Sequence, residues 1–522
     1  PGRLLHVHSV RIRDSGKSHH PWRKAVRSRR QLGTVHAENL PSSSDDPPFG
    51  RSVKLTFSLH GHINKTITEF DLHHHKHLVH PDATIAFHDN DAYSSFPLPN
   101  NVYRMEDTAN GVWAYVSIID EYTFHGHVHQ RDGRTVVIEP TLAKHVHAGD
   151  EGYRRRLDDF HRGHKAMFGS APTLLAYESG SFDFPYGTVE TEQGAFGNTG
   201  TEGRGGRRLT QTLAQTNPPS YFGPYTKLTG ENCLSELKRA DIGLAVDAGF
   251  FHKVSGEDTS VRGYNKVAAY LSSLVAILNL IYVSQLNVFL QIRHIVAFHD
   301  QAAGPTEGGE KDFNQAPLNS DNLDGWNRGE IGCKLSVEGG YADNSDINTY
   351  LDRFRKWQLD YKKTSEDTCK NCAAFHAFTD CFPSPGTIGL AYTGTICRLA
   401  YNVGWNTLGV VSTQTWETFA HEMGHTFGAT HSNSGIMSYK PYAEFTFANE
   451  NGGDAVLQSD GRRYENDNFE RICNTIKDGV DGTGAFWAAN CFKTTVSQCG
   501  NGIVETGEDC DGGECCGSGC SF

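Results

Sequence analysis

The stretch TFAHEMGHTFGATHSNSGIMSYK, residues 418 to 440, decides how the rest of the chain is interpreted. His421 and His425 are four residues apart, so on a helix both imidazoles project from one face, one turn apart. Two zinc ligands need this arrangement, because both nitrogens must reach the same ion. Glu422 lies beside them and can reach a water molecule at that ion. The pattern predicts a metal-binding helix that also carries a carboxylate.

A third ligand is expected just after this helix. Gly428 supplies a residue with positive φ, which ends the helix and turns the chain so that His431 can return to the ion. Three neutral nitrogen ligands leave a fourth position for water, as in catalytic rather than structural zinc sites. Zinc lowers the pKa of such a water to around 7, and Glu422 can accept its proton during attack. We therefore predict one catalytic Zn²⁺ held by His421, His425 and His431.

The length of the motif makes chance an unlikely source for it. A lone His-Glu-x-x-His occurs by chance on many surface helices. The eleven-residue pattern HEMGHTFGATH is far rarer, and Met437 follows only six residues after His431. The sequence thus favours a metal site over an ordinary surface helix.

The segment resembles the metzincin zinc endopeptidases, in which the tripeptide GIM, residues 435 to 437, is the Met-turn below the metal. Within that clan the chain is similar to the ADAM, or reprolysin-type, proteases. FSLHGHINKTITEFDLHHHKHLVHP resembles the start of the ADAM prodomain, and GTIGLAYTGTIC, residues 386 to 397, the edge strand above the cleft. CGNGIVETGEDCDGG, residues 499 to 513, is close to the opening of the disintegrin-like domain.

The resemblance implies a multidomain chain. Short alternating segments such as VKLTFSLHG and RTVVIEP predict a mostly-β prodomain, and a strand, long helix and strand from Leu237 onward predict an α/β domain. This metzincin catalytic domain should have a mixed twisted sheet with helices and the zinc helix at the cleft. We expect a flexible basic, Ser/Pro-rich lead-in (1–50), a reprolysin-like prodomain (51–186), a linker with a basic processing site (187–208), the catalytic domain (209–494) and the truncated beginning of a disintegrin-like domain, a short Cys-rich irregular segment (495–522).

A metzincin binds its polypeptide substrate extended along the edge of the sheet. Gly389, Leu390 and Ala391 are the expected edge partners, with ordinary sheet packing as the alternative. Residues just past Met437 should wall the specificity pocket. Tyr439 matches a position from which Tyr can contact zinc in astacin-like metzincins, and simple packing below the site is the alternative.

The chain also departs from the ADAM pattern. Ser432 stands where ADAM proteases usually carry Asp after the third His. ADAM prodomains often block the zinc with a cysteine, but no cysteine precedes Cys233. We therefore expect the chain's own prodomain to inhibit the enzyme without a cysteine switch.

Cysteine placement and charge bound the cellular setting. Eight cysteines lie between Cys233 and Cys491 and five more in the last 24 residues, which favours a disulfide framework and the secretory pathway. A cytosolic metal-cluster protein would need repeated Cys-x-x-Cys pairs, and only Cys369 and Cys372 have that spacing. The sequon at Asn64 is a candidate glycosylation site. The acidic excess of 61 − 48 = 13 residues argues against nucleic acid as a partner.

An uncharged stretch from Val267 to Ile292 is long enough to cross a membrane. Several polar residues interrupt it, and its second half alternates with a strand period. We predict a buried helix leading into a sheet strand.

The resemblance implies a secreted or cell-surface endopeptidase that cleaves extracellular or membrane-bound proteins. One alternative is a catalytically weak adhesion or decoy protein that presents the disintegrin-like segment to cell-surface receptors, but the intact Glu422 and three histidines argue against it. Another is a zinc-storage protein using HHHKH, residues 73 to 77, which leaves the ordered motif unexplained. A structural Ca²⁺ is compatible with the resemblance but does not follow from the residues.

Histidines are concentrated in the front of the chain, where 20 of 27 precede residue 209. His125, His127 and His129 alternate, so on a strand they share one face. Protonation in mild acid would place like charges side by side and loosen the prodomain. A solvated surface rich in His is the alternative.

Arg207 and Arg208 predict the maturation site. An exposed basic pair in a Gly-rich linker is accessible to processing proteases, so the mature enzyme should begin at about Leu209. Amino-terminal sequencing of the secreted enzyme tests this. A mature start within residues 51–180 would contradict the predicted boundary.

Overall fold

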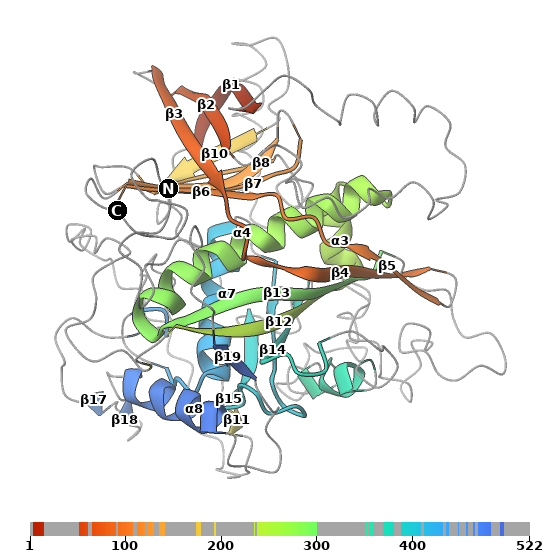
Figure 1. Cartoon of the computed structure of the whole chain (residues 1–522), viewed down its shortest axis with the longest axis vertical. Helices are drawn as coiled ribbons and strands as arrows, with labels where there is room; N and C mark the ends of the chain where they lie inside the picture. Colours follow the sequence, from red (N-terminus) through yellow and green to blue (C-terminus); the bar gives the residue numbers. More distant parts are fainter. Residues whose placement is uncertain are drawn as a thin grey trace, which may run out of the picture.

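A closed eight-stranded barrel and a nine-stranded mixed sheet make up the fold, with one long helix between them (Figure 1). The computed structural model describes residues 4–14, 52–60, 65–89, 92–107, 112–120, 123–129, 135–140, 174–178, 193–194, 234, 237–299, 351–352, 354–359, 361, 369–379, 388–408, 412–431, 435–437, 447, 456–457, 463–464, 468–481 and 491–494.

The barrel comes from the front of the chain. Its strands, in chain order, are β1 (Leu4–Asp14), β2 (Ser52–His60), β3 (Lys65–His74), β6 (Val102–Asp107), β7 (Val112–Ile118), β8 (Phe124–His129), β9 (Thr135–Pro140) and β10 (Leu174–Glu178). They close in the order β1-β10-β9-β8-β7-β6-β3-β2. Leu55, Leu72, Val116 and Ile138 are fully or almost fully buried in its core. The β content agrees with the prediction for this region.

The prediction that residues 1–50 are a flexible lead-in is wrong for residues 4–14, which form β1. This strand pairs with both β2 and β10 and so closes the barrel. The register shifts between Val7 and Val10, and the apolar residues change from odd to even positions at the same place. A β-bulge of this kind hides the strand from a test for strict alternation.

The second half of the chain builds the mixed sheet. Its strands include β11 (Gln193–Gly194), β12 (Lys238–Val246), β13 (Val288–Ala297), β14 (Ala374–Thr379), β15 (Gly389–Thr393), β16 (Val403–Thr407) and β19 (Phe492–Thr494). The helices are α3 (Ala248–Ser255), α4 (Val261–Leu286), α7 (Ser412–Thr426) and α8 (Phe469–Asp481), and β17 (Val456–Leu457) pairs with β18 (Arg463–Tyr464). The strands β12, β13, β14 and β16 are mutually parallel, whereas β15 runs antiparallel to β16 and β19 runs antiparallel to β12. This mixed sheet with helices agrees with the α/β prediction.

A hairpin from the barrel region extends this sheet. The chain leaves β3 at His74 and enters β4 (Val79–Asp89) and β5 (Ala92–Pro97), and β4 pairs in parallel with β13. Ile85 lies opposite Ile295, and both are fully buried. No pattern in the sequence predicted this insertion. The predicted domain boundaries stay predictions. The front part of the chain, which builds the barrel, also contributes the strands β4 and β5 to the mixed sheet.

Helix α4 is the buried helix predicted from the uncharged stretch, and β13 is the strand that follows it. It is long and apolar enough to cross a membrane, but 89% of its most apolar window is buried inside the molecule. Ser260 caps its start by accepting from the Arg262 N–H, and Asn287 ends it with a φ of 54°.

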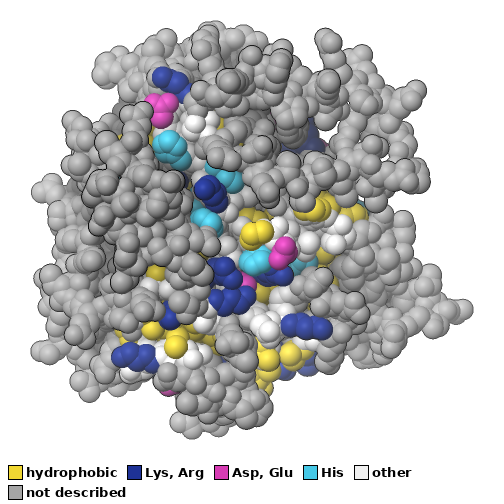
Figure 2. All heavy atoms as spheres, in the orientation of Figure 1, with side chains coloured by type: hydrophobic (Ala, Val, Ile, Leu, Met, Phe, Trp, Pro, Cys, Tyr) yellow, Lys and Arg dark blue, Asp and Glu magenta, His cyan; other side chains and the backbone are white. Residues whose placement is uncertain are grey.

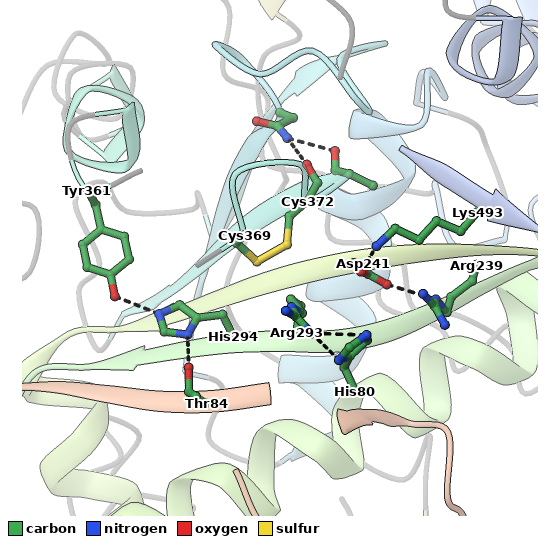
Figure 3. Close-up of a disulfide and its surroundings, with 12 residues drawn as sticks. His80, Thr84, Arg239, Asp241, Arg293, His294, Tyr361, Cys369, Cys372 and Lys493 are labelled. Carbon is green, nitrogen blue, oxygen red and sulfur yellow. Dashed lines mark hydrogen bonds and ion pairs between the residues drawn. A yellow bond between two sulfur atoms is a disulfide. The ribbon is translucent and has the colours of Figure 1, made fainter. Parts of the chain in front are cut away.

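Polar side-chain contacts add to the backbone pairing of β4 with β13 (Figure 3). Thr84 and Tyr361 flank His294, with oxygen to ring-nitrogen distances of 2.9 and 2.8 Å. Burial lowers the pKa of His294 to about 3, so the ring is neutral. Arg293 contacts both His80 and Asp82. Figure 2 shows lysine, arginine and histidine side chains gathered near the middle of the molecular face in view.

The three alternating histidines of β8 lie on the barrel face that packs against α4. The His125 ring meets Tyr270 of α4 edge-on, with centroids 4.9 Å apart, and His129 stacks on Trp113 at 5.4 Å. His127 between them is 3% exposed. The histidines are therefore buried between the barrel and the helix, and the alternative of a solvated surface is wrong.

Acid should weaken this interface. Burial lowers the pKa of His127 to about 4, although the Glu139 carboxylate raises it. An unfolded imidazole titrates near 6.5, so below that pH the unfolded state takes up a proton that the folded state does not. The free energy of unfolding should fall between about pH 6.5 and 4, by up to about 1.4 kcal/mol per pH unit for this ring. Changing His125, His127 and His129 to Gln should reduce that slope, measured by urea unfolding across this range.

His252→Gln, at a partly exposed position on α3 away from β8, is the comparison variant. Some slope should remain in the triple variant, because His294 and His376 are also buried with a pKa lowered to about 3. Identical pH dependence in the wild type and the triple variant would rule out a role for the β8 histidines.

Candidate metal centre

Helix α7 carries the first two histidines because its opposite side is held in the core. Trp416, Phe419 and Met423 are buried, and the Phe419 ring lies 4.6 Å from the His376 ring. Tyr282 of α4 donates its hydroxyl to the Ala420 carbonyl at 3.1 Å. These contacts fix the rotation of α7 about its axis, which sets the direction of the His421 and His425 side chains.

The third histidine follows a tight turn. The helix ends at Thr426, and Gly428 has a φ of 104°, outside the range of most side-chain-bearing residues. The Gly428 and Ala429 N–H groups donate back to His425 and Gly424 of the last helical turn. A Cβ on Gly428 would collide with Thr475 of α8. The turn therefore requires glycine and returns the chain toward the other two rings.

The three imidazoles converge on one point. Their ligand nitrogens all lie within 4.8 Å of one another, and the rings are buried. The Nε2 atom of His425 is 3.1 Å from that of His421 and 3.2 Å from that of His431. His421 Nδ1 lies 2.7 Å from the Ile436 carbonyl and His425 Nδ1 lies 2.8 Å from the Ala429 carbonyl. A carbonyl only accepts, so both Nδ1 atoms carry the proton and both Nε2 atoms present a lone pair.

This donor set fits zinc. In a tetrahedral site with metal–nitrogen bonds of about 2.0–2.1 Å, the nitrogens lie about 3.3 Å apart, close to the separations seen here. Burial lowers the pKa of His421 to about 3 and of His425 to about 4, and it lowers the pKa of His431 further, so the rings are in the neutral form that binds metal. Lone pairs that face one another without a proton between them favour a cation at that point.

Glu422 is the buried acid of the site. Neither of its carboxylate oxygens has a hydrogen-bond partner in the structure, and the side chain is fully buried. Burial raises the pKa of its carboxyl well above the usual range. Gly389 of β15 lies directly over it, since a Cβ there would come within 2.5 Å of Glu422 Oε1. The strand thus leaves room for the carboxylate only because residue 389 has no side chain.

Residues 435–437, the predicted Met-turn, pack against helix α7. Met437 is fully buried against α7, where a Cβ on Gly424 would come within 2.6 Å of its sulfur. The turn contains Gly435 with a φ of 74°, and its Ile436 carbonyl is the one that holds His421. One short turn therefore supplies both packing below the helix and orientation of a ring.

Gly389, Leu390 and Ala391 lie in β15, next to the carboxylate. They pair with β16 on one side, and on the other side β11 pairs with Tyr392 and Thr393 in parallel. Several predicted residues lie outside the part of the chain that the structure describes, namely Tyr439, Asn64, Arg207 and Arg208. Their roles stay predictions.

Sequence reasoning missed the groups that hold the rings. The carbonyls of Ile436 and Ala429 orient His421 and His425, but any residue carries a carbonyl, so no side-chain pattern identifies them. The short strand β11 also lies in the predicted linker, where a Gly/Thr/Glu-rich composition gave no strand signal.

Residues 236–457 match the sequence model of Metallo-peptidase family M12, of the reprolysin type. The matched region runs from the start of β12 through the histidine helix to β17. This region is therefore similar to the reprolysin-type metallopeptidases of family M12. That similarity implies a zinc cofactor, and the three buried histidines are compatible with it.

The chain is similar to disintegrin and metalloproteinase domain-containing proteins, which confirms the ADAM resemblance. Protein B of Aspergillus fumigatus is 26% identical over 362 residues, which is 65% of this chain and 39% of that protein. The protein adm-2 of Caenorhabditis elegans is 33% identical over 146 residues (26% and 14%), and protein 10 of Homo sapiens is 29% identical over 192 residues (30% and 24%). The chain spans about two fifths or less of the length of these relatives.

Gly389→Ala should impair catalysis while leaving the metal bound. The added methyl group would push the Glu422 carboxylate aside. A displacement of about 1 Å in a reacting group can cost roughly 10²-fold in rate, and we expect a loss of that order in kcat/KM. Peptide cleavage and zinc content are measured together on the purified chain.

Gly243→Ala in β12 is the matched control. Its Cβ would also be crowded, lying 2.4 Å from the Phe375 ring and 3.0 Å from the Cys369 sulfur, but it would not touch Glu422. Loss of activity that tracks loss of stability equally in both variants would contradict a specific effect of Gly389 on the carboxylate.

Proposed function

We propose that the chain is a metzincin-type, zinc-dependent endopeptidase that hydrolyses peptide bonds of extracellular or membrane-bound proteins. The observation that carries this proposal is the Glu422 carboxylate, which is fully buried and without a hydrogen-bond partner beside three converging histidines. A buried carboxylate in that condition costs stability. Its presence is explained if Glu422 contacts water and substrate in the working enzyme.

Glu422 acts in this proposal as the general base. It takes a proton from the attacking water and passes it to the departing amine. Burial raises the pKa of its carboxyl well above the usual range, which makes the carboxylate a stronger base for the proton of the attacking water. Bound zinc would polarise the scissile carbonyl and acidify water. His421, His425 and His431 would hold the ion through the nitrogens that burial keeps neutral.

The substrate would bind as an extra strand along β15. The residues Gly389 to Ala391 lie beside Glu422, so main-chain hydrogen bonds to them would place a peptide carbonyl close to the carboxylate. The small residues at 389 and 391 allow close approach of another backbone. Residues following Met437, including Tyr439, are the proposed wall of the specificity pocket.

The chain's own front part is the proposed inhibitor. Gln193 and Gly194 pair with Tyr392 and Thr393 on the outer edge of β15, the edge that a substrate strand would need. This segment lies shortly before Arg207 and Arg208, so cleavage there would separate it from the metallopeptidase domain. The arrangement provides latency without a cysteine.

The proposed setting is the secretory pathway, ending outside the cell or at its surface. Disulfides support it, since Cys369 pairs with Cys372 and Cys397 pairs with Cys491. The relatives are named as disintegrin and metalloproteinase domain proteins. By analogy, segment 495–522 is proposed to open a disintegrin-like domain that contacts cell-surface receptors.

Glu422→Gln should keep the zinc site but remove the base. The change preserves the size of the side chain, so we expect zinc to stay bound while kcat falls by roughly 10²–10⁴-fold, the usual contribution of a general acid–base group. The assay is cleavage of a peptide library by the processed chain, with and without a zinc chelator.

Glu417→Gln makes the same chemical change on the same helix and should leave kcat unchanged. Near-normal turnover by a zinc-loaded Glu422→Gln protein would disprove the assigned role. Cleavage that persists after chelation would disprove zinc dependence.

A further inference from the structure

We infer that Asn468 is a positioning residue for the third metal ligand, His431. This inference rests on the proposed zinc site. His421 and His425 are held by the helix α7, whereas Thr430 and His431 lie beyond it, outside any regular element. The direction of the His431 ring therefore depends on whatever fixes the backbone just before it.

Asn468 holds that backbone through both ends of one amide. Its Nδ2 donates to the Thr430 carbonyl at 2.6 Å, and its Oδ1 accepts from the Thr430 N–H at 2.8 Å. The Thr430 hydroxyl adds a third contact to the same oxygen at 3.2 Å. Donor and acceptor together fix the orientation of both peptide groups of Thr430, and one of these links directly to His431.

The clamp itself is rigid, because Asn468 is anchored at the start of α8. Its side chain is fully buried, and its carbonyl accepts from Ile472 in the first turn of the helix. Ile472 and Ile476 of α8 are fully buried in the main core. Arg471, three residues after Asn468, reaches the same turn, with its Nε 3.4 Å from the Gly428 carbonyl. Helix α8 thus holds the turn that leads from α7 to His431.

Removing the amide should affect metal binding more than folding. Without it, the Thr430 peptide groups would lose their partners in a partly buried place, and the chain could rotate to find new ones. His431 would then leave the point where the other two lone pairs meet. Groups that orient metal ligands typically contribute 10–100-fold to metal affinity, and we expect a loss of that size.

The chain contains a matched control for the clamp. Asn279 in α4 holds the Leu290 backbone in the same two-point manner, with distances of 2.9 Å for Nδ2 to the carbonyl and 2.7 Å for the N–H to Oδ1. It is also buried, but it holds β13 rather than a segment next to a metal ligand. Asn279→Ala removes the same two hydrogen bonds and should cost similar stability.

The test measures zinc affinity in the full chain by competition with a chromogenic chelator, for the wild type, Asn468→Ala and Asn279→Ala. We expect Asn468→Ala to bind zinc about 10–100-fold more weakly and Asn279→Ala to bind it normally. The visible absorption of the Co²⁺-loaded protein should change in Asn468→Ala only, because it reports the geometry of the ligands.

Equal zinc affinity and an unchanged Co²⁺ spectrum in Asn468→Ala would overturn the inference, as would an equal loss in Asn279→Ala. If Asn468→Ala does not fold, Asn468→Asp keeps the size and the acceptor but loses the donor to the Thr430 carbonyl, and it should bind zinc more weakly than the wild type. Normal affinity in that variant would also overturn the inference. Absence of zinc binding in the wild type would instead refute the proposed function.

Discussion

The metal centre depends on two backbone carbonyls that decide which nitrogen of each ring carries the proton. Ile436 and Ala429 accept from the Nδ1 atoms of His421 and His425, so the Nε2 lone pairs face each other 3.1 Å apart. Without a cation the facing lone pairs repel one another. The folded protein therefore favours a cation at this point. The turns at Gly428 and Gly435 place those two carbonyls beside the rings, and both turns use a glycine with positive φ.

Features set by neighbours in sequence could be predicted. The four-residue spacing of His421 and His425 is a property of any helix, and Gly428 ends this one as its residue type suggests. The buried helix α4 and the strand after it were also readable, because a long uncharged run gives way to alternation. In each case the residues that determine the local structure are neighbours in the sequence.

Features set by distant segments could not be predicted. The Asn468 amide bonds to Thr430, which lies 38 residues earlier in the chain. Nothing in the sequence around Asn468 distinguishes it from an ordinary asparagine in a turn. The pairing of β4 with β13 joins positions more than 200 residues apart, such as Thr84 and His294. The bulge in β1 broke the alternation that would have identified it.

The insertion of the β4–β5 hairpin bears on how the front of the chain could be released. Cutting the linker removes a covalent connection, but the pairing of Ile85 with Ile295 and the contact of Thr84 with His294 do not involve the linker. Release must also expose the edge of β13, and a free edge is a template for pairing with other chains. Separation is therefore governed by non-covalent contacts, and the barrel side of those contacts includes the buried histidines of β8 against α4. In the proposed maturation, cleavage and dissociation would be two distinct steps, and the second would depend on conditions that change the cost of burying those rings.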